Sequence, residues 1–324
     1  MKKYLITGYS GFVSPHFLNY LESLKEECAV LGVDVYQPAF EDDYQYVKCS
    51  FQQTNLLEKT RVEKTLQTFQ PDYILHLASY SSVAYSWKNP VASFVNNTNI
   101  FLNLVDQIRA LKLSCKMLSV GSSEEYGNVE PKFLPLREDL PPKPVNPYAI
   151  ARVSQEMLSQ LYARSYETDI ILTRSFNHIG PGQRDIFVVS AFAKKLVALK
   201  NDGFSAKRIT AGNLEIVRDF VDVRDVVKAY YLLLNHGQSG EIYNICSETG
   251  HSLKDILRRM MEIVNIEAEI IIDETLIRPN DNQVIIGSNQ KIQRQTGWKP
   301  AIPLEQSLQD IIDYWREEIR SPEK

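Results

Sequence analysis

Short apolar runs alternate with longer amphipathic segments over roughly the first half of the chain. Runs such as KYLITG (3–8) and DYILHLAS (72–79) are almost continuously apolar, which is typical of strands buried on both faces of a parallel sheet. The segments between them repeat apolar residues at helical spacing. The pattern predicts an α/β fold with a doubly wound parallel sheet covered by helices on both faces. The expected strands are 3–8, 29–36, 72–79, 115–123 and 169–176, and the expected helices are 16–27, 61–71, 91–111 and 147–166.

The pattern changes after Asn177, where loops become more frequent and strands become shorter. Residues 223–246 form another helix–strand unit that we expect to return to the main sheet. An amphipathic helix lies within residues 297–319, and no flexible linker separates the two parts of the chain. We therefore expect two directly packed domains. The larger comprises residues 1–176 with about 217–247, and the smaller, mixed α/β domain comprises about 177–216 with 248–324.

The composition excludes several classes of protein. Of the 324 residues, 44% are hydrophobic and 23% are charged, and the net charge is −4. This balance indicates no general nucleic-acid or anionic-membrane surface, and no apolar run is long enough to span a bilayer. The four cysteines are dispersed, so we expect neither a disulfide framework nor a metal site. The opening residues MKKYLITG lead directly into a strand, and we expect no signal peptide and a cytoplasmic protein.

The segment TGYSGFVS (7–14) joins the first strand to the first helix. Gly8 and Gly11 supply the tight turn and the close backbone approach that a pyrophosphate at a helix N-terminus needs. Ser14 takes the third glycine position of the dinucleotide fingerprint and is small enough for helix–strand packing. Asp34 ends the second strand, where a carboxylate accepts a hydrogen bond from a ribose 2′-hydroxyl and repels a 2′-phosphate. The segment predicts a Rossmann-type domain that binds NAD(H), with NADP(H) as the alternative.

The segment NPYAIAR (146–152) places a phenol and a cation four residues apart, at Tyr148 and Arg152. Pro147 suits the first turn of a helix, so the two side chains lie on one helical face. A nearby cation favours the ionised form of a phenol, which suits proton transfer. On spacing alone, two unrelated surface residues are the better interpretation of this pair.

The segment GSSEEYG (121–127) lies at the sheet edge where open α/β folds bind ligands. There Ser122 could hydrogen-bond a reacting oxygen, and Glu124 could act as a second acid or base. Alternatively, Ser122 and Ser123 cap a turn and both glutamates are solvated.

The second part of the chain holds candidates for substrate contact. Asn177 follows a strand end, whereas we expect His178 to be structural. Arg218 lies beside an acid in an expected loop, and Arg278 lies in IRPND. Isolated arginines usually form surface salt bridges, but two together could clamp a diphosphate. We expect Trp298 to pack in the core and not to stack on a base.

Together these motifs resemble the extended short-chain dehydrogenase/reductases that act on nucleotide sugars. The resemblance runs in family order from Thr7 to Pro300 and covers nearly the whole chain. Within that family the chain is most similar to the branch of GDP-4-keto-6-deoxy-D-mannose reductase and GDP-mannose 4,6-dehydratase. One departure is Arg152, which stands at the position of the family's catalytic lysine. The matching motifs are TGYSGF, Asp34, HLAS, SSVAYSW, Asn97, GSSEEYG, NPY, FNHIGPGQ, VRDFVDVRD, IRP and GWKP.

The resemblance implies a catalytic set in which Ser122 positions the reacting oxygen, Tyr148 donates a proton and Arg152 supplies the cation, with Glu124 as a further acid or base. It also implies the positions that bind the two ligands. The cofactor-binding positions are Thr7, Gly8, Ser10, Gly11, Phe12, Val13, Asp34, Leu77, Ala78, Ser79, Asn97, Tyr148 and Arg152. The substrate-binding positions are Ser82, Ser123, Glu124, Asn177, Val188, Lys194, Arg218 and Arg278.

The activity implied by the resemblance is NAD(P)H-dependent reduction of the C4 ketone of a GDP-4-keto-6-deoxy-hexose, in nucleotide-sugar and polysaccharide biosynthesis. One alternative is a 4-dehydrogenase or 4,6-dehydratase of a GDP-hexose or GDP-heptose with tightly bound NAD. Another, from a different class, is a non-catalytic nucleotide-sugar-binding protein. The resemblance further implies a homodimer in which the helices at 91–111 and 147–166 form a four-helix interface.

Overall fold

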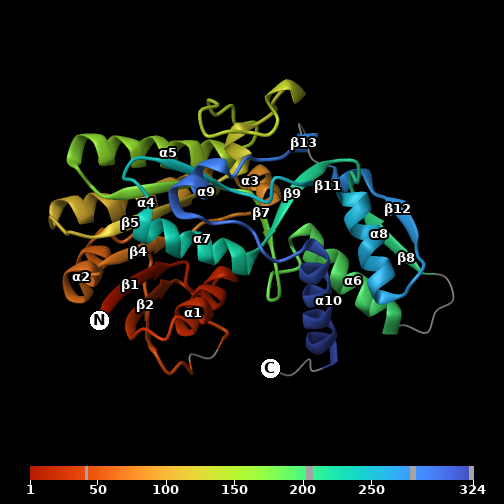
Figure 1. The fold of residues 1–324 in the computed structure, drawn as a ribbon, viewed down its shortest axis with the longest axis horizontal. Helices are drawn as coiled ribbons and strands as arrows, with labels where there is room; N and C mark the ends of the chain where they lie inside the picture. The colour runs from red at the N-terminus through yellow and green to blue at the C-terminus, as the bar shows by residue number, and fades with distance from the viewer. Residues whose placement is uncertain (41–42, 202–206, 278–281, 321–324) are drawn as a thin grey trace.

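The fold is known from a computed structural model that describes residues 1–40, 43–201, 207–277 and 282–320. Its centre is a seven-stranded sheet in the order β10-β6-β5-β4-β1-β2-β3, in which all neighbouring strands are parallel (Figure 1). This sheet confirms the predicted doubly wound architecture. The strands are β1 (Lys2–Thr7), β2 (Cys28–Asp34), β3 (Val47–Gln53), β4 (Tyr73–His76), β5 (Lys116–Ser122), β6 (Ile170–Ser175) and β10 (Ile242–Ile245).

Helices cover both faces of this sheet because its strands are apolar on both sides. In β1, Tyr4 and Ile6 pack toward α1 and α7, whereas Leu5 packs toward α2 and α4. α9 joins the first layer and α5 joins the second. The helices are α1 (Val13–Ser23), α2 (Lys59–Phe69), α3 (Val83–Lys88), α4 (Pro90–Ala110), α5 (Pro147–Tyr166), α7 (Val223–His236) and α9 (Gln290–Thr296).

One local expectation is wrong, and one strand was not anticipated. The first helix begins at Val13 and ends at Ser23, before the expected residue 27, because Lys25 adopts a left-handed conformation with φ 55°. The strand β3 was not expected from the pattern. It is an edge strand whose residues are mostly exposed or half-buried, so it lacks the apolar run that marks the buried strands.

The second half of the chain builds a separate core beside the main sheet (Figure 1). Helices α6, α8 and α10 pack against one another and against two small sheets, one in which β9 pairs with β7, β11 and β13 and one formed by β8 and β12. Residues 242–245 return to the main sheet as predicted. The elements are β7 (Asn177–Ile179), α6 (Val188–Asn201), β8 (Arg208–Ala211), β9 (Val217–Asp222), β11 (Gly250–Ser252), α8 (Leu253–Val264), β12 (Glu269–Ile272), β13 (Val284–Ile285) and α10 (Leu304–Arg320), and the 3₁₀ turns are η1 (Ser123–Tyr126), η2 (Pro131–Phe133) and η3 (Glu274–Leu276).

The two halves meet where the carboxyl ends of the parallel strands face β7 and the loop after it. The ring of Phe12, before α1, stacks on His178 with centroids 5.9 Å apart. His16 Nε2 lies 2.9 Å from the carbonyl oxygen of Pro181. Trp298 is buried and donates from Nε1 to the carbonyl of Asp225, which confirms that it packs in the core.

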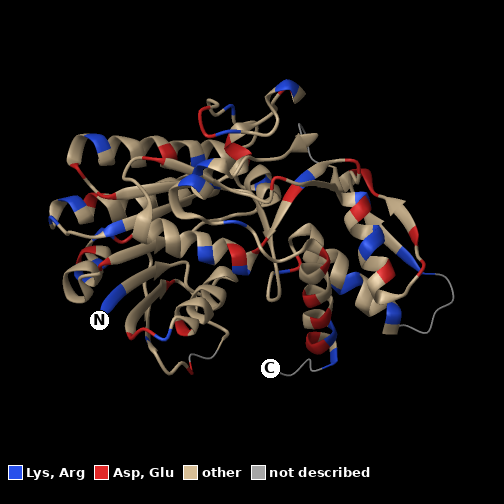
Figure 2. Cartoon of the chain, viewed as in Figure 1, with Lys and Arg blue, Asp and Glu red and all other residues tan. Residues whose placement is uncertain are grey.

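Charged residues of both signs are interspersed along both halves of the chain (Figure 2). In the part of the chain that the structure describes, none of the helices combines the length and apolarity that crossing a membrane requires.

Candidate active site

The turn between β1 and α1 has the geometry of a phosphate-binding turn. Gly8 has φ 74°, and a Cβ there would lie 2.6 Å from the backbone nitrogen of Ala78, so only glycine fits. At the start of α1 the described residues offer no side-chain cap and no acidic side chain in the first turn. No side chain therefore competes with an anion at this helix N-terminus, as the binding of a dinucleotide pyrophosphate requires.

Asp34 lies at the carboxyl end of β2, beside this turn. Its carboxylate accepts hydrogen bonds from the backbone N–H groups of Ser10 (3.0 Å), Val35 (2.7 Å) and Tyr36 (3.3 Å). These bonds fix the carboxylate at the rim of the turn. A carboxylate can accept about four hydrogen bonds, so one acceptor position is left for a ribose hydroxyl.

The carboxyl end of β4 forms the floor of the same region. Thr7 Oγ1 lies 2.8 Å from His76 Nδ1, which ties β1 to β4. Burial lowers the pKa of His76 to about 3, and the positive charge of Arg152 acts in the same direction. The imidazole is therefore neutral, and its Nε2 is buried without a partner among the described residues. Asn97, on α4, fixes the loop that follows β4 through two hydrogen bonds to the backbone of Tyr80. Its Oδ1 accepts from the N–H of Tyr80 at 2.8 Å, and its Nδ2 donates to the carbonyl at 3.2 Å.

Tyr148 and Arg152 form a buried pair at the start of α5. Asn146 caps this helix by accepting from the N–H of Ala149 at 2.8 Å, and Pro147 occupies its first turn. Arg152 Nε donates to Tyr148 Oη at 3.2 Å, and Nη1 donates to the carbonyl of Val120 in β5 at 2.9 Å. The pair is thus not a surface feature, because Arg152 is only 4% exposed and Tyr148 only 6%.

Ser122 and Glu124 lie in the turn after β5, beside this pair. Ser122 Oγ accepts from the N–H of Glu124 at 3.2 Å, so the serine does cap the turn, as one interpretation of the sequence held. Glu124 is half-buried and accepts from Asn146 Nδ2 at 2.9 Å, a contact that links the turn to the start of α5. Ser123 is buried in the same turn.

Two buried residues of this region carry no signal in the sequence. Glu125 is 0% exposed, so the expectation that both glutamates are solvated is wrong for it, and its Oε1 accepts from the N–H of Ser122 at 2.6 Å. Gln155 Oε1 accepts from Arg152 Nη1 at 2.7 Å. In sequence, glutamate and glutamine at such positions look like ordinary solvent-facing residues, and only the packing of α5 on β5 reveals them.

The structure brings together only some of the substrate-binding candidates from the second half of the chain. Asn177 begins β7, directly after β6, and its side chain makes no hydrogen bond with the described residues. The expectation that Arg218 lies in a loop is wrong, because it lies in β9, which is flanked by three other strands. Its buried Nη1 donates to the carbonyl of Asn282 at 2.7 Å. Arg278 lies outside the described residues.

Lys194 and Ser82 are engaged by protein groups. Lys194 Nζ donates to Asp185 at 2.7 Å and lies 4.9 Å from the ring of Trp315 in α10, so its described contacts are within the second half of the chain. Val188 begins α6, six residues before Lys194. Ser82 Oγ accepts from the N–H of Tyr85 at 3.2 Å and caps α3.

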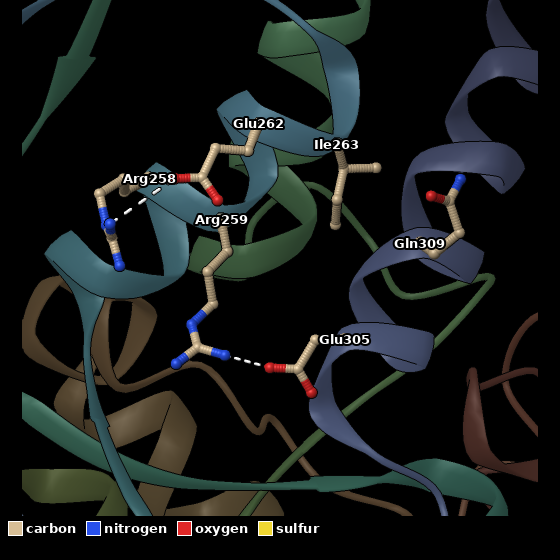
Figure 3. A pocket seen from close by; sticks show the side chains of 6 residues that line it. All are labelled: Arg258, Arg259, Glu262, Ile263, Glu305 and Gln309. Atoms are coloured by element: carbon tan, nitrogen blue, oxygen red, sulfur yellow. Dashed lines mark hydrogen bonds and ion pairs between the residues drawn. The ribbon is translucent and has the colours of Figure 1, made fainter.

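A shallow hollow of about 420 Å³ lies between α8 and α10, in the second half of the chain (Figure 3). Its arginines are already paired, Arg258 with Asp255 and Glu262 and Arg259 with Asp255 and Glu305. Because these ion pairs occupy both guanidinium groups that line the hollow, we do not assign the site there.

Comparison with known proteins decides the family. The family model described as GDP-mannose 4,6 dehydratase matches residues 5–311. The chain belongs to this family. The GDP-6-deoxy-D-mannose reductase of Pseudomonas aeruginosa is 32% identical over 98% of this chain and 99% of its own length. The GDP-6-deoxy-D-talose 4-dehydrogenase of Aggregatibacter actinomycetemcomitans is 33% identical over 90% of each chain.

The structure of RMD from Pseudomonas aeruginosa complexed with NADPH has a TM-score of 0.84 and 31% sequence identity to this chain, covering 98% of it and 100% of that protein. These similarities confirm the resemblance inferred from the motifs, including the extended short-chain dehydrogenase/reductase type. The similarity to this NADPH complex supports NAD(H) or NADP(H) as the cofactor. The glycine turn before α1 has a geometry that fits the pyrophosphate of such a cofactor.

Proposed function

We propose that this protein reduces the C4 ketone of a GDP-4-keto-6-deoxy-hexose with NAD(P)H, and that Tyr148 is the proton donor. The observation that carries the proposal is the buried Tyr148–Arg152 pair, with Nε and Oη 3.2 Å apart beside the carboxyl end of β5. Near-complete alignment with a GDP-6-deoxy-D-mannose reductase supports this choice of substrate class.

The chain's own residues account for the protonation half of the reaction. When bound, the dinucleotide would supply a hydride for the C4 carbon of the sugar. As the C=O electron pair moves onto oxygen, Tyr148 Oη gives that oxygen its proton, and the ketone becomes a secondary alcohol. Arg152 favours the resulting phenolate through its positive charge, and solvent later restores the proton to Tyr148. Ser122, at the end of β5, would hold the reacting oxygen by a hydrogen bond.

The substrate would lie between the carboxyl ends of the parallel strands and β7. Asn177 has a side chain free for this purpose. Arg218 lies in β9, which pairs with β13, the next strand along the chain after Arg278. The guanidinium of Arg218 would suit a diphosphate of the substrate. In this proposal residues 1–176 with about 217–247 hold the dinucleotide and the remaining residues hold the GDP-sugar.

A second candidate is oxidation at C4, alone or as the first step of a 4,6-dehydration. Glu124 favours it, because its half-buried carboxylate lies in the turn after β5 and could take a proton from a sugar carbon. The similarity to a GDP-6-deoxy-D-talose 4-dehydrogenase supports the oxidative direction as well.

The two directions are separated by following NADH and NADPH absorbance with GDP-4-keto-6-deoxy-mannose as substrate. We expect steady oxidation of the cofactor, with NADH at least as effective as NADPH because of Asp34. Tyr148→Phe should lower turnover about 100-fold or more, whereas Glu124→Gln should retain much of it. Turnover by Tyr148→Phe equal to the parent contradicts the proposal. If the parent converts GDP-mannose to its 4-keto-6-deoxy form and Glu124→Gln abolishes this conversion, the second candidate replaces the proposed reduction.

We also propose that the protein is a cytoplasmic homodimer that serves polysaccharide biosynthesis. α4 and α5 pack side by side and expose apolar side chains at helical spacing, which a second copy of the same face would cover. The dispersed cysteines suit a reducing compartment.

A further inference from the structure

Arg152 is held by three hydrogen bonds to buried acceptor groups. Its Nη1 donates to the Val120 carbonyl at 2.9 Å and to Gln155 Oε1 at 2.7 Å, and its Nε donates to Tyr148 Oη at 3.2 Å. No described residue accepts from Nη2, which is also not among the fully enclosed atoms that lack a partner. The guanidinium therefore keeps two N–H groups for a ligand.

Gln155 is the residue that orients this guanidinium. It is 1% exposed, one turn after Arg152 on α5. Its Nε2 donates to Ser119 Oγ at 2.8 Å and to the Val120 carbonyl at 3.3 Å. Since a carbonyl can only accept, Nε2 must face Val120, and Oε1 must face the guanidinium. Ser159 completes the network, because its Oγ lies 3.0 Å from Ser119 Oγ and donates to the carbonyl of Gln155 at 2.8 Å.

The amide is also neutral, which matters for the charge. A carboxylate at this position would orient the guanidinium equally well but would cancel its charge at Tyr148. A glutamine fixes the flat arginine fork and leaves the whole positive charge for the phenol and the dinucleotide.

We propose that Gln155 is a positioning residue that enables an arginine to serve as the cation of Tyr148 and to present Nη2 to the cofactor's ribose hydroxyls. This inference rests on the proposed function of the Tyr148–Arg152 pair.

Two substitutions separate orientation from charge. Gln155→Leu keeps the volume and removes the acceptor, so we expect NADH affinity and turnover each to fall about tenfold. Gln155→Glu keeps the acceptor and adds a negative charge, so the pH–rate profile should move about one unit to higher pH with a smaller loss of NADH affinity. Gln160→Glu makes the same charge change on the same helix, outside the network, and should move neither quantity.

A double substitution tests whether Gln155 acts through Arg152. If it does, Gln155→Leu should cost less in an Arg152→Lys background, since an ammonium has no Nη1 for the amide to orient. NADH affinity is measured by fluorescence titration, turnover against pH by absorbance, and folding by circular dichroism and thermal unfolding.

The outcomes distinguish this inference from the proposed function. If Tyr148→Phe turns over like the parent, the proposed function fails. If Tyr148→Phe is inactive but folded Gln155→Leu and Gln155→Glu match the parent in affinity and pH profile, only the role of Gln155 fails. Equal costs of Gln155→Leu in the parent and in the Arg152→Lys variant would also overturn it, because the amide would then act on packing alone.

Discussion

Glu125 shares one guanidinium with a second buried carboxylate. Arg174 makes two 2.8 Å hydrogen bonds to Glu156 and lies 4.0 Å from Glu125 Oε2. Burial raises the pKa of Glu125 well above its usual range, and the charge of Glu156 raises it further, whereas Arg174 opposes both effects. When the carboxyl of Glu125 is ionised, its Oε2 has no hydrogen-bond partner among the described residues. When it is protonated, Oε2 can donate a hydrogen bond to Glu156. These effects favour the form in which Glu125 carries a proton, which leaves the cluster of two carboxyls and one arginine without net charge.

This proton makes folding stability depend on pH. Because the folded-state pKa of Glu125 is raised, its contribution is complete at low pH and is lost as pH rises from about 4.3, the unfolded value, through the folded value. Glu125→Gln mimics the protonated form at every pH. We expect the variant to lack this loss, which amounts to at most about 1.4 kcal/mol per pH unit.

Urea unfolding of parent and variant between pH 4 and 8 measures this difference. Glu124→Gln, at the neighbouring half-buried position, is the control and should follow the parent. Parallel curves for the parent and Glu125→Gln would show that Glu125 is ionised in the folded protein.

At the scale of single residues, the sequence predicted pairs of side chains along one helix better than contacts between different helices and strands. The spacing of Tyr148 and Arg152 predicted a shared helical face, and the structure joins them at 3.2 Å. The partners Gln155 and Glu125 could not be found in this way. Their contacts are with β5 and with Arg174 in β6, and no local spacing encodes which polar residue a neighbouring strand will cover.

Asp222 links two helices at the scale of secondary-structure elements. It caps α7 by accepting from the N–H of Arg224 at 2.8 Å, and it accepts from Ser307 Oγ of α10 at 2.6 Å. Burial alone would raise the pKa of Asp222, but the hydrogen bonds from Arg224 and Ser307 outweigh it and lower the pKa. Its contribution to stability is therefore present above the unfolded value, about 3.9, and is lost as pH falls through the folded value.

Asp222→Asn should lower the free energy of unfolding at pH 7 by about 1–3 kcal/mol, since it keeps a helix cap of similar strength but removes the charge from the buried hydrogen bonds to Arg224 and Ser307. The difference from the parent should shrink below about pH 4, where the parent's carboxylate is protonated. Urea unfolding at a series of pH values measures both effects. Asp310→Asn, which removes the other acidic partner of Arg224, should cost less because the Asp310 side chain is 22% exposed, whereas that of Asp222 is fully buried. A pH-independent difference would mean that packing, and not the charge, carries the effect.

Periodicity located the long elements well and the irregular ones poorly. α4 and α5 lie within one residue of their expected bounds because they repeat apolar residues over several turns. β9 was taken for a loop because its charged residues, Arg218 and Asp219, interrupt the apolar run. Both are buried, and Asp219 accepts from the backbone of Ser247, Glu248 and Gly287, which replaces the lost solvation.

For the molecule as a whole, the exposed face of α4 and α5 predicts self-association. Val91 is 75% exposed, Met157 60% and Leu161 52%, and each lies on one of two helices that pack side by side. Exposed apolar side chains on adjacent helices are typical of interaction surfaces. In a two-fold symmetric dimer the same face meets its own copy, so two helices from each subunit would form a four-helix interface.

Symmetry also makes this interface sensitive to single substitutions, because each change appears twice. Leu161→Glu should bring two buried carboxylates into one apolar interface and weaken the dimer about 100-fold or more. Sedimentation velocity over a concentration series should show a dimer for the parent and a monomer for the variant. Ile271→Glu makes a similar apolar-to-acidic change at an exposed position of β12, remote from this face, and should leave the dimer intact.

If Ile271→Glu dissociates the dimer and Leu161→Glu does not, the interface lies at β12 and not at α4 and α5. If the parent is a monomer at micromolar concentration, the proposed dimer is wrong. Because Tyr148 and Arg152 begin α5 on its buried side, the dissociated variant should keep its cofactor site, and NADH titration of the monomer tests that separation directly.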